Sequence, residues 1–62
     1  MFDNLEAEQA RKRLTNQQVA EVLGLSRVSY EKKKRTGKFV VAEISNLCKL
    51  FNCDFSYLFA TE

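Results

Sequence analysis

Two helix starts and one helix stop lie close together near the middle of this 62-residue chain, and their spacing constrains the fold most strongly. Thr15 is followed three positions later by Gln18, the arrangement of a reciprocal capping box at a helix start. Gly24 suits the left-handed residue that ends a helix, and Ser26 is a favourable N-cap for the next one. The sequence therefore predicts two short helices, 16–23 and about 27–35, joined by a tight turn.

Apolar spacing orients these two helices. Val19, Ala20 and Leu23 recur at helical intervals and form one inward stripe. In the helix over about 27–35, Tyr30 is the inward residue. At about 100° per residue, Val28, Lys32 and Arg35 then point outward. Leu25 against Tyr30 would form a hydrophobic staple. The same geometry places Lys33 and Lys34 on the inward side, where we expect their aliphatic stems to cover the core while the ammonium groups reach water, or the helix to fray early.

Three further helices are predicted around this pair. The first spans about residues 1–13, with Asp3 or Asn4 as its N-cap. The fourth spans 41–51 and carries a regular apolar stripe of Val40, Ile44, Leu47, Cys48 and Phe51. Asn52 suits its C-cap, Asp54 caps a last short helix over 55–60, and Gly37 ends the third helix. The predicted fold class is all-α, as a single five-helix domain over residues 1–62.

Composition narrows the function. The chain has no histidine, no glycine-rich phosphate loop and two cysteines, Cys48 and Cys53, which are too few ligands for a structural zinc site. We therefore expect no enzyme activity, metal, cofactor or small-molecule ligand. No signal-like or membrane-spanning stretch is present, so we expect a cytoplasmic protein.

Positive charge is concentrated after the tight turn. Six of the ten basic residues lie between Arg27 and Lys38, against the single acid Glu31. On charge alone, a solvated helix face would be the better interpretation. Because the run coincides with the capped helix pair, it favours a surface that binds nucleic acid.

The segment LTNQQVAEVLGLSRVSY, from Leu14 to Tyr30, resembles the helix-turn-helix of phage repressor and Cro proteins, the XRE family. This resemblance implies a lambda-repressor-like domain that binds double-stranded DNA sequence-specifically, with the helix over about 27–35 in the major groove. It also implies a transcriptional repressor that forms a homodimer, at least on DNA, over a palindromic operator. One departure is clear: the family often pairs an Arg of the first helix with a Glu of the third, where this chain has Gln9 and Lys34, so that ion pair is not expected.

The resemblance assigns roles to the exposed residues. Arg27 and Lys32 would donate to guanine, Val28 would contact a thymine methyl group, Ser29 would bond a base or a phosphate, and Glu31 would accept from cytosine or repel misplaced phosphate. Five other residues would bind phosphates of the DNA backbone: Asn16, Gln17, Lys33, Arg35 and Lys38.

The C-terminal segment is unusually apolar. Four large side chains in five positions exceed what one side of a short helix can bury, which predicts a dimerisation surface of Phe55, Tyr57, Leu58 and Phe59. The alternative is that all four fold back onto the core. Two alternative functions also stand: a protein-interaction module of helix-turn-helix fold that modulates a partner repressor, or the N-terminal DNA-binding part of a longer repressor.

Overall fold

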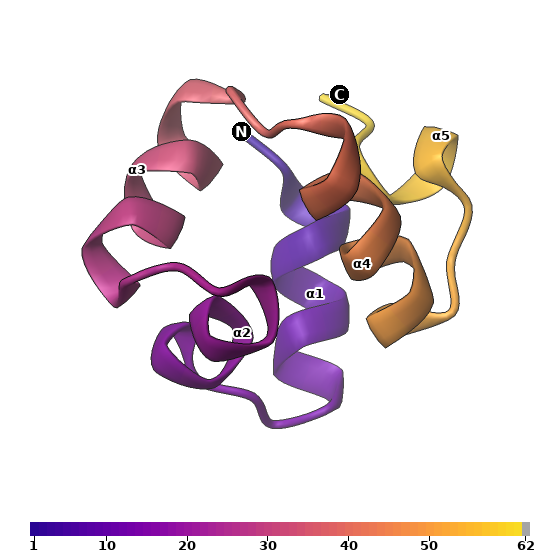
Figure 1. Cartoon of the computed structure of the whole chain (residues 1–62). Coiled ribbons are helices and arrows are strands. Elements are labelled where there is room, and N and C mark those ends of the chain that lie inside the picture. The colour runs from indigo at the N-terminus through magenta and orange to yellow at the C-terminus, as the bar shows by residue number, and fades with distance from the viewer. Residues whose placement is uncertain (62) are drawn as a thin grey trace.

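Five α-helices account for the regular structure of residues 1–61, the part of the chain that the computed structural model describes (Figure 1). No strand occurs in that range. The helices are α1 (Asp3–Arg11), α2 (Asn16–Leu23), α3 (Arg27–Thr36), α4 (Val41–Phe51) and α5 (Phe55–Leu58). Helix α2 packs against α3 and α4, while α5 packs against α1 and α4. The predicted all-α fold with five helices is thus confirmed.

The predicted boundaries of α2 and α3 are confirmed by their hydrogen bonds. The Thr15 Oγ1 atom accepts from the Gln18 backbone N–H at 3.1 Å, and the Gln18 side chain accepts from the Thr15 N–H at 2.8 Å. Gly24 is left-handed at φ 71°. The Ser26 hydroxyl accepts from the Ser29 N–H at 3.1 Å. Helix α3 does not fray early, because it continues to Thr36 before the left-handed Gly37.

The start of α1 differs from the prediction. Its N-cap is Phe2, and the two residues predicted as alternative caps, Asp3 and Asn4, both lie inside the helix. The cause is tertiary: the Phe2 side chain is buried and packs edge-on against Phe59, with ring centroids 5.3 Å apart, which anchors the chain just before the helix.

The ends of α1 and α5 also differ from the prediction. Helix α1 ends at Arg11 rather than at Arg13, because Arg13 has a left-handed φ of 56°. Helix α5 is shorter than 55–60, and Asp54 occupies its N-cap position without a side-chain capping bond.

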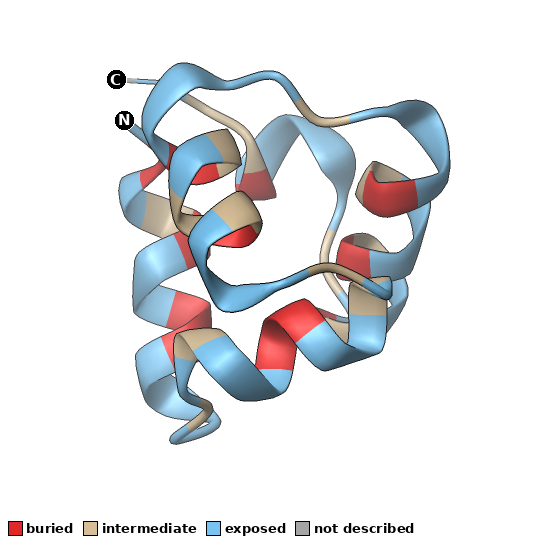
Figure 2. Cartoon of the chain, turned by 60° about the vertical axis from the view of Figure 1, so that its left-hand side comes forward, coloured by how far each residue is buried: buried red, intermediate tan, exposed pale blue. Residues whose placement is uncertain are grey.

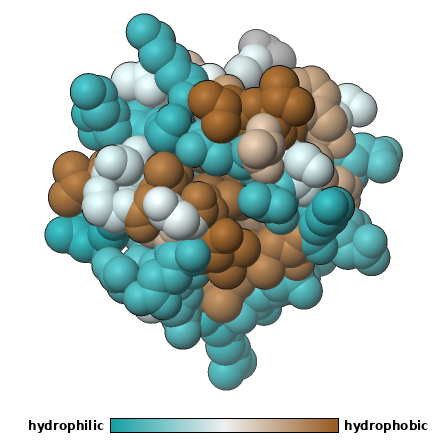
Figure 3. Space-filling model, viewed as in Figure 1, coloured by the Kyte–Doolittle hydropathy of each residue, from teal (hydrophilic) through white to brown (hydrophobic). Residues whose placement is uncertain are grey.

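The core forms where the inward faces of all five helices meet, as the buried positions in Figure 2 show. Six apolar side chains in it are completely buried: Leu5, Val19, Ala20, Tyr30, Leu47 and Leu58. Figure 3 shows that hydrophobic side chains also reach the surface in the middle of one face, with hydrophilic side chains around them. Within residues 1–61, none of the helices is both long and apolar enough to span a membrane.

Candidate nucleic-acid interface

Helix α3 separates its side chains into an exposed face and a buried face. Val28, Lys32 and Arg35 are exposed, as predicted, and the Val28 side chain is 64% exposed despite being apolar. On the opposite side Tyr30 is fully buried and Lys34 is 8% exposed. This exposed face therefore presents two cations beside an apolar side chain, a combination that can contact both phosphates and base edges.

Lys34 is buried inside a polar cluster. Its Nζ atom lies 2.8 Å from the Asn16 Oδ1 atom, 3.0 Å from the Glu6 carboxylate and 4.8 Å from the centre of the Tyr30 ring. The expectation that this ammonium reaches water is therefore wrong, because acceptors from α1 and α2 replace the water. Lys34 thus pairs with Glu6 of α1, three residues before Gln9, the position at which the resemblance would place an arginine.

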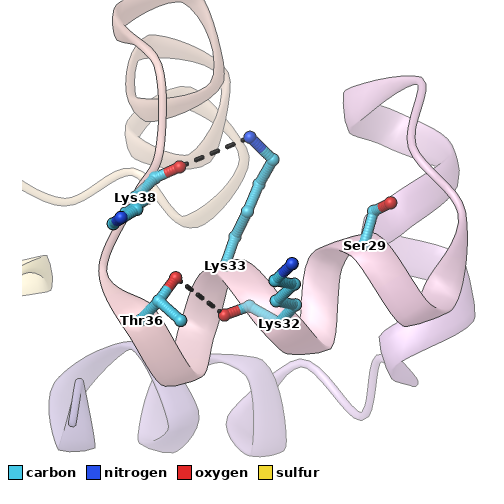
Figure 4. A pocket seen from close by; sticks show the side chains of 5 residues that line it. All are labelled: Ser29, Lys32, Lys33, Thr36 and Lys38. Atoms are coloured by element: carbon cyan, nitrogen blue, oxygen red, sulfur yellow. Dashed lines mark hydrogen bonds between the residues drawn. The ribbon is translucent and has the colours of Figure 1, made fainter.

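The Lys33 side chain forms an ion pair within the protein. Its ammonium lies 3.2 Å from the Glu43 carboxylate of α4 and donates to the Lys38 backbone carbonyl at 3.3 Å (Figure 4). This pairing ties the end of α3 to α4, and it neutralises much of the charge that a phosphate would otherwise meet at Lys33.

Asn16 begins α2, but its side-chain amide is largely engaged. The Oδ1 atom accepts from the Gln9 amide at 2.9 Å and from the Lys34 ammonium at 2.8 Å, and the Nδ2 atom donates to Glu31 at 3.0 Å. An amide has two N–H donors, so one of them is left over. Gln17 is exposed, and its side chain donates to Glu21 at 3.1 Å.

Glu31 and Arg27 form an ion pair on the outer side of α3. The Arg27 Nη1 atom lies 2.9 Å from the Glu31 Oε2 atom, four residues along the helix. The hydrogen bond from Asn16 and then the one from Arg27 lower the pKa of the Glu31 carboxyl. Glu31 is therefore ionised at neutral pH and holds Arg27 from one side.

A shallow pocket of about 320 Å³ opens beside the last turns of α3 (Figure 4). It is lined by Ser29, Lys32, Lys33, Thr36 and Lys38. Among residues 1–61, neither Lys32 nor Lys38 forms an ion pair with an acid, whereas Lys33 is paired with Glu43. Two ammonium groups without an acidic partner and the Ser29 hydroxyl, which keeps its own proton free, suit an anion such as a phosphate.

Thr36 belongs to this pocket and was not among the predicted site residues. Its hydroxyl donates to the Lys32 carbonyl one turn earlier, at 3.0 Å. The signal available in the sequence was its position four residues after Lys32 and just before the helix-ending Gly37.

The C-terminal aromatic segment divides into an exposed and a buried part. Phe55 is 58% and Tyr57 is 41% exposed, whereas Leu58 is fully buried and the Phe59 ring packs edge-on against Phe39, 5.6 Å away. The prediction that some of these side chains remain exposed is confirmed. Leu58 and Phe59 belong to this chain's own core, so only Phe55 and Tyr57 remain for the predicted dimer contact.

Both cysteine thiols, Cys48 and Cys53, are free and half-buried. Burial raises the pKa of the Cys48 thiol. Residues 1–61 contain no group of three or more Cys, Asp or Glu side chains placed to hold a metal ion.

No family model, curated protein or solved structure matches this chain.

Proposed function

We propose that this protein binds double-stranded DNA sequence-specifically and acts as a transcriptional repressor of the phage Cro type. In this proposal the fold is a lambda-repressor-like domain, with α2, the turn from Gly24 to Ser26 and α3 as its helix-turn-helix. The supporting observation is the exposed face of α3, which presents cations and an apolar side chain while the opposite face is held firmly in the core. The major groove admits an α-helix with a face of this kind.

Each part of the exposed face has a separate role. Arg27 and Lys32 carry donors that match the O6 and N7 acceptors of guanine, and Val28 matches the methyl group of thymine. The pocket beside α3 would hold a backbone phosphate between Lys32 and Lys38, which fixes the register of the helix without reading sequence. Asn16 contributes at most one N–H to a phosphate, because its other groups are engaged.

A single domain of this size would bind one half-site weakly, so we propose a homodimer on a palindromic operator. Two copies of α3 one turn of DNA apart would read half-sites about 10 bp apart, centre to centre. Occupancy of an operator that overlaps a promoter would exclude polymerase, and this is the proposed mechanism of repression.

The test is a fluorescence-anisotropy titration with two labelled duplexes at two salt concentrations. One duplex is recovered by selection from a randomised library, and the other is its scrambled version. We expect affinity for the selected duplex to be at least about 10³-fold higher and to fall steeply as salt rises. Equal and weak binding to both duplexes would overturn the proposal.

A protein-interaction module is the second candidate. It is favoured by the exposed Phe55 and Tyr57 rings, and by the acids Glu31 and Glu43 that neutralise part of the charge on α3. Equal weak binding in the titration above would support this candidate, and the two rings would then be the surface to probe.

A further inference from the structure

A chain of hydrogen bonds connects the buried core to the exposed face of α3. It begins at the buried Tyr30 hydroxyl, which donates to the Gln9 Oε1 atom at 2.8 Å. The Gln9 Nε2 atom donates to the Asn16 Oδ1 atom at 2.9 Å, and the Lys34 ammonium donates to the same oxygen at 2.8 Å. Two donors from the packed interior thus fix the orientation of the Asn16 amide.

The fixed amide determines where Glu31 lies. The Asn16 Nδ2 atom donates to the Glu31 Oε2 atom at 3.0 Å, and that same oxygen accepts from the Arg27 Nη1 atom at 2.9 Å. Glu31 is therefore held from α2 on one side and holds Arg27 on the other. Without these contacts the Arg27 side chain, which is 53% exposed, would be free to sample many rotamers.

We propose that Glu31 is a positioning residue that determines the base preference of Arg27, by holding the guanidinium in one orientation toward the major groove. This inference rests on the proposed DNA-binding function. Arg27 has five N–H donors, so the bond to Glu31 leaves enough of them for a bidentate contact with guanine O6 and N7. A mobile Arg27 would donate readily to phosphates instead, and phosphate contacts carry no sequence information.

The proposal predicts a signature that a merely structural role would not give. Glu31 places a negative charge beside DNA, so its removal should leave affinity for unrelated DNA unchanged or increase it. Only discrimination at the base pair read by Arg27 should fall. Loss of folding would instead lower affinity for all duplexes together.

The experiment selects duplexes from a randomised double-stranded library with the parent, with Glu31→Ala and with Glu31→Gln. Glu31→Gln retains the shape of the side chain in case Glu31→Ala fails to fold. Glu21→Ala is the matched control, because it also removes one glutamate charge, from α2, and Glu21 forms no hydrogen bond or ion pair with Arg27 among the described residues. We expect Glu31→Ala to lose preference for guanine about tenfold or more at one position of each half-site, Glu31→Gln, whose amide oxygen can still accept both bonds, to lose less of it, and the control to retain it.

An Arg27→Ala background completes the test. There, adding Glu31→Ala should not change the base preference further, because the residue that Glu31 positions is absent. The inference is overturned if the Glu31 variants keep the parent's preference, including the case in which they bind the selected duplex more tightly and Glu31 only competes with DNA for Arg27. If the parent recovers no preferred sequence, the proposed function itself fails.

Discussion

At the scale of single residues, the buried Lys34 is the least expected feature. Removing an ammonium group from water is costly unless other groups replace its hydration. Here Glu6 supplies a carboxylate, Asn16 supplies an amide oxygen and the Tyr30 ring supplies its face. Because the Glu6 side chain is 54% exposed, one partner of the pair stays hydrated, which reduces the cost of burying the other.

Lys34→Ala should lower the free energy of unfolding by about 2 kcal/mol, since it removes charge-assisted hydrogen bonds and leaves the Asn16 oxygen short of one donor. Lys32→Ala, on the exposed face two residues earlier, should change it by less than about 0.5 kcal/mol. Urea denaturation of both variants and the parent checks this. Equal stability of the two variants would contradict the importance of the buried cluster.

Tyr30 should make the folding stability of the protein depend on pH in the alkaline range. Burial, and then the Glu6 charge, raise the pKa of its phenol above the usual value of 10.0. In the unfolded chain Tyr30 ionises near pH 10, while in the folded chain it keeps its proton. Its contribution is therefore fully present below pH 10 and is lost as pH rises further. We expect stability, measured by urea denaturation on either side of pH 10, to fall more steeply in the parent than in Tyr30→Phe.

At the scale of elements, the α2 start depends on local hydrogen bonds. Thr15 and Gln18 satisfy each other's backbone N–H groups, which the helix itself leaves unpaired. Thr15→Ala should therefore cost about 1 kcal/mol of unfolding free energy, whereas Thr15→Ser, which keeps the hydroxyl, should cost much less. Thermal denaturation followed by circular dichroism distinguishes them, and an equal loss in both variants would exclude capping as the cause.

The end of α3 and the residues after it should supply affinity without specificity. Lys38 is exposed and lines the pocket beside α3. Lys38→Ala should weaken binding to every duplex and reduce the slope of log affinity against log salt by about 1, because one phosphate contact is lost. Anisotropy titrations over a range of salt measure the slope. A change limited to the selected duplex would instead make Lys38 a base-reading residue.

At the scale of the whole molecule, stability is small because the chain is small. For 62 residues a total of about 3–9 kcal/mol is expected. The molecule measures only 25 × 23 × 18 Å, so every helix borders both the core and solvent. Loss of one core side chain is therefore a large fraction of the total.

Substitutions in the C-terminal segment should affect folding or self-association according to the burial of the residue. Leu58→Ala should lower the free energy of unfolding by about 2–5 kcal/mol, because the Leu58 side chain is fully buried. A loss of this size would leave much of the variant unfolded. Phe55→Ser should leave the monomer folded and shift self-association toward the monomer, because this ring is 58% exposed. Sedimentation velocity with and without operator DNA measures the association. If Phe55→Ser associates as the parent does, the dimer forms through another surface.

The sequence by itself determined the boundaries of α2 and α3, where the helix signals are local. The Thr15–Gln18 box, Gly24, Ser26 and Gly37 act through backbone bonds a few residues away, so they can be recognised without knowledge of the fold. The exposed positions on α3 followed in the same way, because helical periodicity fixes them once Tyr30 is placed inward.

Only the tertiary structure decided which polar groups meet. Lys34 and Glu6 are far apart in sequence, and so are Asn16 and Glu31, so no local pattern indicates that these side chains bond. The same holds for Phe2, which begins α1 because rings from distant segments bury it. Backbone signals act over one turn of helix, whereas the partners of a side chain are decided by packing between helices, and packing also decides which side chains of α3 stay free to contact a ligand.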